Sequence, residues 1–215
     1  MARSDDLGLT FPKANKKKVA TITPIGSLTL CGSSSRRVLS TGTGKDIRVN
    51  DFPAIAVDGA GTVYVVWNDG RFDASDVLLS RSTDLGATWS APIVVNPTTE
   101  GAQFFPNIVV DGDGVHVMYY SLDFSTGLID VKVATSTDGG LTFTETTVSD
   151  GGFPVVQTNP NFDPVIQDCY MGDYNWIASD GVTRYAVWGD NRTTIFTPGF
   201  PGGRNDPDIR FDTVP

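Results

Sequence analysis

Short apolar runs alternate with polar turns along most of this chain, and the pattern repeats. Residues 52–59 (FPAIAVDG) return as 105–112 (FPNIVVDG), 53 positions later. A second run, 61–67 (GTVYVVW), has its counterpart at 114–119 (GVHVMY), and a third, 76–80 (DVLLS), at 130–134 (DVKVA). Each run is too short for a typical helix, is rich in β-branched residues and is bounded by Gly and Asp. The pattern therefore predicts strands joined by tight turns.

A third, divergent copy follows near the C-terminal end. It comprises 176–181 (WIASDG), 183–188 (TRYAVW) and 206–211 (DPDIRF), and upstream residues 38–44 with 47–50 resemble the end of a preceding copy in which Gly42 replaces the Asp of the turn. Units of about 50 residues with four short strands, repeated in tandem, predict an all-β propeller of four-stranded blades. The expected ranges are 51–104, 105–150 and 173–215 for the blades, 38–50 for the degenerate end, and 1–37 for a basic segment outside the clear repeats or part of a degenerate blade.

Two octapeptides close the first two units, 82–89 (STDLGATW) and 136–143 (STDGGLTF). In this spacing a Ser hydroxyl and an Asp carboxylate bind the backbone of their own turn, Gly supplies a positive φ, and the aromatic ring packs between strands. We expect turns between the third and fourth strands of each blade. The residues that would hold them are Ser82, Asp84, Gly86, Trp89, Ser136, Asp138, Gly140 and Phe143.

The octapeptide resembles the Asp-box, or BNR repeat, of the sialidase-like superfamily of propellers. Segments 67–71 (WNDGR) and 187–192 (VWGDNR) are also similar to bacterial proteins labelled exo-α-sialidase. The resemblance implies six blades, so that three units form an incomplete ring or a fragment. It implies boxes on the face opposite an active site, which makes Asp84 and Asp138 structural. It further implies glycan recognition, with or without glycoside hydrolase activity on sialosides; the alternative is a non-catalytic scaffold or protein-interaction module.

The catalytic pattern of a sialidase is only partly present. Such an enzyme would carry an Arg-Ile-Pro segment, three arginines that bind the sugar carboxylate, a Tyr nucleophile paired with Glu, and an Asp acid/base. Where the arginine segment is expected the chain has 51–55 (DFPAI), without Arg. Glu145 directly follows an Asp-box on the structural side, which leaves Glu100 as the candidate partner of the candidate nucleophile Tyr174.

Strand order predicts which loops share the functional face. If the first strand of each blade is innermost, the loops between second and third strands lie beside the loops that enter each blade. The candidate substrate-binding residues collected there are Asp69, Arg71, Asp123, Asp173, Asp190 and Arg192. They suit a hydroxyl-rich or anionic glycan; the alternative is that Asp and Arg pair with each other and fix their own loops.

Charge and composition exclude several classes of partner. Among the 215 residues, Lys+Arg number 16 and Asp+Glu 25, which gives a net charge of −9, and the basic residues concentrate in the first 50 positions. The acidic remainder argues against nucleic acid, and no apolar run approaches the roughly 18 residues of a membrane span. The first residues lack the apolar core of a secretion signal; an extracellular location is expected if the chain is a fragment of a secreted protein.

The remaining chemistry gives few candidates. Cys31 and Cys169 form either one long-range disulfide or two free thiols. Residues 111–114 (DGDG) resemble a fragment of a calcium loop, but the downstream Glu is missing and the position requires a turn, so no metal or cofactor is expected. The open blade edges predict self-association, or else that the sequence is part of a longer chain.

Overall fold

The protein is built almost entirely from antiparallel sheets. The computed structural model describes residues 1–31, 34–41, 46–155, 169–172 and 174–214. Apart from one short 3-10 turn (Lys13–Asn15) the regular elements are strands. No helix in these ranges is long and apolar enough to cross a membrane. The all-β prediction is confirmed.

Three sheets follow one another as consecutive meanders, and we call them blades 1, 2 and 3. Blade 1 has the strand order β4 (Ala54–Val57), β5 (Val63–Asp69), β6 (Asp76–Ser82), β7 (Ile93–Val94). Blade 2 has the order β8 (Ala102–Asp111), β9 (Gly114–Asp123), β10 (Leu128–Ser136), β11 (Thr144–Thr147), and β12 (Phe153–Pro154) also pairs with β10. Blade 3 has the order β13 (Trp176–Ser179), β14 (Arg184–Thr197), β15 (Phe200–Val214). A series of four-stranded meanders stacked face to face is the architecture of a β-propeller.

A smaller sheet precedes blade 1. It contains β1 (Ser27–Cys31), β2 (Ser34–Ser40) and β3 (Asp46–Arg48). The segments expected to end a preceding copy, 38–44 and 47–50, overlap with β2 and β3, and residues 42–45 lie outside the described residues. A disulfide between Cys31 and Cys169 ties β1 to the segment that leads into β13, which decides the alternative left open by the sequence.

Apolar side chains between the blades form the core. Tyr64, Val66 and Leu79 of blade 1 pack against Ile108 and Tyr119 of blade 2. A second cluster joins blade 2 to blade 3 in the same way. Every residue of β5 is buried, because this central strand is covered on both faces. Two-sided burial explains why the central strands read as continuous apolar runs and not as alternating patterns.

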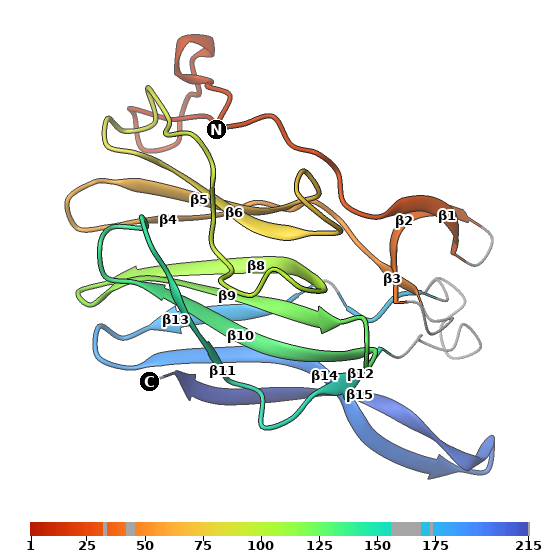
Figure 1. Cartoon of the computed structure of the whole chain (residues 1–215). Helices are drawn as coiled ribbons and strands as arrows, with labels where there is room; N and C mark the ends of the chain where they lie inside the picture. The colour runs from red at the N-terminus through yellow and green to blue at the C-terminus, as the bar shows by residue number, and fades with distance from the viewer. Residues whose placement is uncertain (32–33, 42–45, 156–168, 173, 215) are drawn as a thin grey trace.

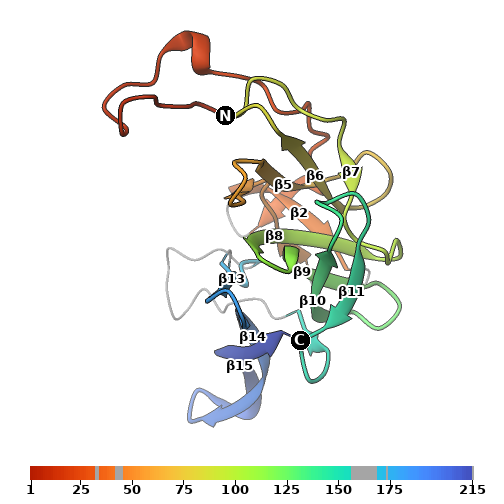
Figure 2. The same cartoon turned by 90° about the vertical axis from the view of Figure 1, so that its left-hand side faces the viewer.

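The stack is open. Figure 1 shows blade 1 above blade 2 and blade 3 below it, with the N-terminal residues at the top. After a quarter turn, Figure 2 again places the N-terminal residues and the β14–β15 hairpin at opposite ends of the stack. The described blades therefore form part of a ring, as the three repeats predict.

Candidate functional site

The two predicted Asp-box turns are closed by their own side chains. Ser82 Oγ donates to Asp84 Oδ1 (2.7 Å), and the amide of Gly86 donates to Ser82 Oγ (2.8 Å). The Thr88 amide and hydroxyl donate to Asp84 at 2.8 and 2.6 Å, and these bonds with that from Ser82 lower the pKa of Asp84 to about 2. The turn at 136–143 repeats the pattern. A carboxylate whose acceptor sites are used within its own turn is a structural group.

A third turn of the same kind lies at residues 4–11 (SDDLGLTF). Ser4 Oγ donates to Asp6 Oδ1 (2.6 Å), the Gly8 amide donates to Ser4 Oγ (2.8 Å), and Thr10 donates to Asp6 from its amide (2.8 Å) and hydroxyl (2.6 Å). Leu7 has a φ of 58°, matching the 57° of Leu85. The spacing is visible in the sequence, but no strand-like run precedes it, so the prediction took 1–37 as a basic segment outside the clear repeats or as part of a degenerate blade. The hydrogen bonds of this turn match those of boxes 82–89 and 136–143.

The opposite end of the stack holds the predicted functional loops. In an antiparallel meander, the start of the inner strand and the hairpin between the second and third strands lie at one end, and the box turns lie at the other. In Figure 1 the hairpins β5–β6, β9–β10 and β14–β15 are at the right, and the turns β4–β5, β8–β9 and β13–β14 are at the left. We call the right-hand end the loop end.

Two ion pairs lie at the loop end, Asp69 with Arg71 and Asp190 with Arg192. Arg71 Nε and Nη2 donate to the Asp69 carboxylate at 2.9 and 2.8 Å, and Nη2 also donates to the Thr21 carbonyl (2.6 Å). Arg192 Nε donates to Asp190 Oδ1 (2.9 Å) and Arg192 also pairs with Asp150. This geometry corresponds to the alternative in which each pair fixes its own loop.

The buried carboxylates of these pairs are held in the charged form. Burial by itself would raise the pKa of Asp69, but hydrogen bonds from Arg71 and from Trp67 Nε1 (2.9 Å) outweigh it, so the pKa lies below the usual value. Asp190 behaves in the same way beside Arg192. A group kept ionised in this manner does not serve as a proton donor near neutral pH.

The other predicted site residues do not converge. Glu100 is exposed, and its backbone carbonyl accepts from Gln103 Nε2 (2.9 Å). Asp123 is exposed and accepts from the Ser125 amide (2.7 Å) within its own turn. Asp173 lies outside the described residues. Neither Glu100 nor Asp123 lines a cavity shared with Tyr174.

Tyr174 lies in a hollow between the beginnings of β4 and β13 and the register shift within β8, and we call it the axial hollow. Its volume is about 300 Å³. The lining comprises Phe52, Pro53, Ala54, Phe105, Pro106, Asn107, Tyr174, Asn175 and Trp176. Phe52, Tyr174 and Trp176 are exposed aromatic rings contributed by blades 1 and 3. Equivalent positions of three repeats therefore surround one hollow.

Buried amides hold the floor of the axial hollow. The Phe105 amide donates to Asn68 Oδ1 (3.3 Å), and Asn175 Nδ2 donates to the Phe105 carbonyl (2.9 Å). Phe105 has a φ of 53°, a left-handed conformation that costs on the order of 1–3 kcal/mol for a residue with a side chain. Asn68 and Asn175 come from the blades on either side, so all three blades fix this point.

Asp51 is a carboxylate that the sequence did not single out, and it lines a separate cavity of about 450 Å³ between residues 18–22 and blade 1. It precedes Phe52, and its Oδ1 accepts from Asn68 Nδ2 (2.9 Å) and from the Ile25 amide (3.3 Å). Burial raises the pKa of Asp51 despite these bonds. A carboxyl at the start of an inner strand with a raised pKa is a candidate acid/base group, and only its environment in the fold could reveal it.

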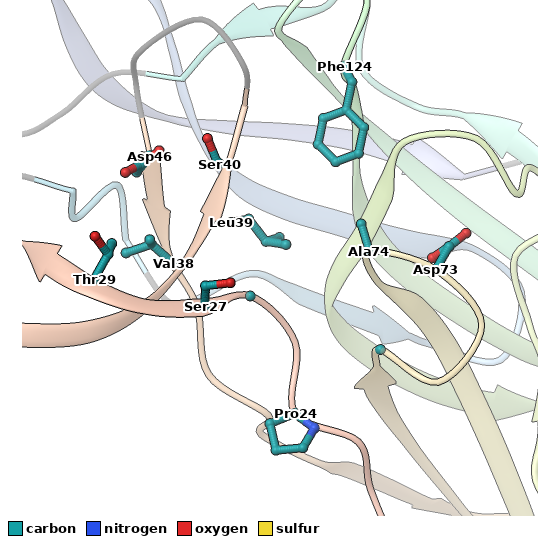
Figure 3. Close-up of a pocket in the computed structure, with 12 residues that line it drawn as sticks. Pro24, Ser27, Thr29, Val38, Leu39, Ser40, Asp46, Asp73, Ala74 and Phe124 are labelled. Carbon is teal, nitrogen blue, oxygen red and sulfur yellow. The ribbon is translucent and has the colours of Figure 1, made fainter.

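A larger cavity of about 560 Å³ lies between the β1–β3 sheet and the loops of blades 1 and 2, and we call it the lateral cavity. Figure 3 shows Asp46 and Leu39 on the side of β2–β3, with Asp73 and Phe124 on the side of the loops. Two carboxylates and an aromatic ring suit hydroxyl groups. The described lining contains no Lys or Arg side chain.

The calcium-like fragment at 111–114 forms the turn between β8 and β9. Asp111 accepts from Arg184 Nε (2.8 Å) and from Ser179 Oγ (2.8 Å), and Asp113 pairs with Arg184. These carboxylates join blade 2 to blade 3 as partners of an arginine. The described part of the chain holds no cluster of three or more metal-ligating side chains.

Comparison with known proteins finds similarity only among solved structures. No family model matches the sequence, and no curated protein matches it. A Hadza microbial sialidase is 14% identical with a TM-score of 0.48, over 75% of this chain and 35% of that one. A thermostable family-43 glycoside hydrolase is 16% identical with a TM-score of 0.44, over 79% and 58%. The Trypanosoma rangeli sialidase in complex with sialic acid is 14% identical with a TM-score of 0.39, over 87% and 31%. The chain spans less than two thirds of the length of each.

Proposed function

We propose that the chain binds carbohydrate at the axial hollow. The observation that carries the proposal is the gathering of exposed aromatic rings, Phe52, Tyr174 and Trp176, around one hollow at the loop end. An exposed ring presents a flat apolar face, and the apolar C–H face of a pyranose packs on such a surface, as other apolar groups do. The side-chain amide of Asn107 at the same hollow offers hydrogen bonds to hydroxyl groups, while Asn175 holds the floor through its bond to the Phe105 carbonyl.

A neutral sugar fits this site better than a sialoside. Recognition of a sugar carboxylate calls for arginines with free donors, and the guanidinium groups of Arg71 and Arg192 are held by Asp69 and Asp190. Hydrolysis with two carboxylates would need an acid and a second carboxyl about 5–10 Å apart. The described lining of the axial hollow contains no carboxylate, which supports binding without turnover.

The test measures binding and turnover together. Titration calorimetry with neutral oligosaccharides of galactose, xylose and arabinose, and with sialyllactose, gives affinities, and a fluorogenic sialoside reports hydrolysis. We expect binding of a neutral oligosaccharide, weakened at least tenfold, or about 1.4 kcal/mol, by Tyr174→Ala and by Trp176→Ala. Phe196→Ala is the matched control, since Phe196 is an exposed aromatic far along the β14–β15 hairpin.

Three results would move or remove the proposal. Loss of binding in Phe124→Ala but not in Tyr174→Ala would place the ligand in the lateral cavity. Sialoside turnover that Tyr174→Phe abolishes would support the sialidase alternative with Tyr174 as nucleophile. The absence of both binding and hydrolysis for all of these sugars would favour the scaffold or protein-interaction alternative.

A further inference from the structure

The lining of the axial hollow consists of the same three consecutive positions in each of three repeats. They are residues 52–54, 105–107 and 174–176, and each triplet ends four positions before the Asp of its Asp-Gly turn. The middle copy differs from the other two at its aromatic position. Phe105 is 5% exposed, whereas its counterparts Phe52 and Tyr174 are 56% and 84% exposed. One copy therefore turns its ring into the core, and the backbone at this position forms the floor of the hollow.

A bulge in β8 gives Phe105 this orientation. Phe105 and Pro106 fall within a register shift between β8 and β9, and Phe105 has a φ of 53°. Its ring packs edge-on against Phe104 and Tyr120, with centroids 5.1 and 6.3 Å away. A bulge leaves its extra residue outside the ladder of the sheet, and a left-handed residue with a side chain persists only where the surrounding structure holds it. The backbone of Phe105 therefore needs hydrogen-bond partners outside its own sheet.

Two buried asparagines from the neighbouring blades are these partners. Asn68 Oδ1 accepts from the Phe105 amide (3.3 Å), and Asn175 Nδ2 donates to the Phe105 carbonyl (2.9 Å). An asparagine side chain has an acceptor on one side of its amide and a donor on the other, so Asn68 supports the Phe105 amide in only one orientation. In the flipped orientation, the NH2 group of Asn68 would oppose the N–H of Phe105.

Asp51 selects the supporting orientation of Asn68. Its Oδ1 accepts from Asn68 Nδ2 (2.9 Å). An ionised carboxylate is only an acceptor, so it keeps the NH2 group of Asn68 toward itself and the carbonyl oxygen toward Phe105. A protonated carboxyl carries a donor as well, and its bond to the amide is weaker, because hydrogen bonds to an ionised group are about twice as strong as neutral ones. The hydrogen bonds thus run in one direction, from Phe105 through Asn68 to the charge of Asp51.

Charged groups from three parts of the chain surround Asp51. Burial raises the pKa of Asp51 above its ordinary value, and the hydrogen bonds that it accepts offset this only in part. Arg37 on β2 favours the ionised form, and Asp69 on β5 disfavours it. Lys18 lines the same cavity as Asp51. Since Arg71 holds the pKa of Asp69 below its usual value, Asp51 is the carboxylate of this group that gains a proton first as the pH falls.

We propose that Asp51 is a positioning residue for the axial hollow: its carboxylate orients Asn68, and Asn68 holds the Phe105 bulge on which a bound sugar rests. The inference rests on the proposed binding of carbohydrate at this hollow. Asp51 lines a different cavity, so it acts on the hollow through Asn68. Protonation of Asp51 removes the charge that fixes the amide, and the affinity for sugar therefore falls as the pH decreases. Because burial raises the pKa of Asp51, the fall begins at a higher pH than an exposed Asp would give.

Titration calorimetry from pH 7.5 to pH 4 with the neutral oligosaccharides of galactose, xylose and arabinose tests this dependence, and near-UV circular dichroism at each pH checks that the protein is folded. For the oligosaccharide that binds, we expect the wild-type affinity to fall by roughly fivefold or more, which corresponds to the loss of one hydrogen bond. Asp51→Asn keeps the size of the side chain and removes its charge. It should lower the affinity at pH 7.5 by a similar factor and abolish the dependence on pH. Asp212→Asn is the matched control, because Asp212 is an exposed carboxylate on β15, and it should change neither.

Swapping the two side chains separates positioning from a general effect on the fold. In the double variant Asp51→Asn with Asn68→Asp, the carboxylate at position 68 accepts from the Phe105 amide and from the new amide at position 51, so the direction of the hydrogen bonds is kept. Asn68→Asp alone places two carboxylates together and should weaken binding by roughly fivefold or more. The swap should restore the affinity to within about twofold of the wild type. A double variant that binds no better than either single variant would refute the proposal.

Hydrogen exchange at the Phe105 amide follows the same network without any sugar. Exchange should be about tenfold faster in Asp51→Asn than in the wild type and should become slow again in the swapped variant. If no oligosaccharide binds but exchange behaves in this way, the proposed function is wrong and the role of Asp51 in placing the floor stands. If an oligosaccharide binds and Asp51→Asn changes neither its affinity nor the dependence on pH, the proposed function stands and Asp51 is not a positioning residue. Unchanged exchange at Phe105 in Asp51→Asn would overturn the network itself.

Discussion

The disulfide between Cys31 and Cys169 offers a sharp test of the long-range architecture. The two residues are 138 positions apart, and both are buried beside Val38. The backbone around them is also joined, since the Arg48 amide donates to the Cys169 carbonyl (2.8 Å). The bridge therefore fixes the β1–β3 sheet, one wall of the lateral cavity, to the segment entering blade 3.

The expected loss on removing the bridge follows from chain entropy. Closing a loop of this length lowers the entropy of the unfolded chain by about 17 cal/mol/K, which corresponds to about 5 kcal/mol at 25 °C. For a chain of this size each kcal/mol moves the thermal midpoint by about 2–4 °C, so the full effect lowers it by roughly 10–20 °C. Measured values for native disulfides are commonly about 2–5 kcal/mol, and this range is the expectation.

Urea unfolding followed by tryptophan fluorescence measures the effect, because Trp67 and Trp188 are buried and become exposed on unfolding. The wild-type protein is compared with and without reductant, and a variant with both cysteines replaced by Ala is the control that reductant should leave unchanged. Two results would refute the reasoning: titratable thiols in the untreated native protein, or a wild-type unfolding midpoint that reductant does not shift.

Three further predictions concern stability. Burial lowers the pKa of His116 below its usual 6.5, so the folded state loses stability as the pH falls below about 6.5, by at most about 1.4 kcal/mol per pH unit. Urea titrations from pH 7 to 5 should show a free energy of unfolding that falls with pH, and His116→Gln should make this fall less steep. Equal pH dependence in the two proteins would contradict the prediction. Leu79→Ala should lower the free energy of unfolding by about 2–5 kcal/mol, and the exposed Leu28→Ala by much less, since only Leu79 lies between blades. Asp6→Ala should speed hydrogen exchange at the Gly8 and Thr10 amides without changing exchange in blade 2, and unchanged exchange at these amides would count against a closed box at 4–11.

Most of the fold could be predicted from the spacing of the repeats and from the residues of the turns. The Asp-Gly turns and the two octapeptides place four strands per unit in the sequence, and the sheets β4–β7 and β8–β11 follow that order. The box at 4–11 was equally readable, because Ser4, Asp6 and Gly8 have the same spacing as Ser82, Asp84 and Gly86. Such turns are predictable because their hydrogen bonds connect residues within eight positions.

The candidate site was less predictable. Tyr174 was identified by its place before an inner strand, but its neighbours Phe52 and Trp176 were not, since they meet only when three inner strands lie side by side. For the same reason, the sequence did not decide whether Arg71 binds a ligand or pairs with Asp69, and the structure shows the ion pair. Sequence spacing does not say which donors remain free once a loop has folded.

The sequence by itself determined the strands, the tight turns and the three-fold repetition, because these depend on local backbone preferences and on the period of apolar residues. Only the tertiary structure decided the Cys31–Cys169 pairing, the axial hollow, the half-buried environment of Asp51 and the exposure of Ile55 and Phe211. The physical reason is that each of these depends on which sheet faces stack against each other. Equivalent positions of a repeat carry similar residues whether or not a neighbour covers them, so the pattern of apolar residues is the same for a buried face and for an exposed one.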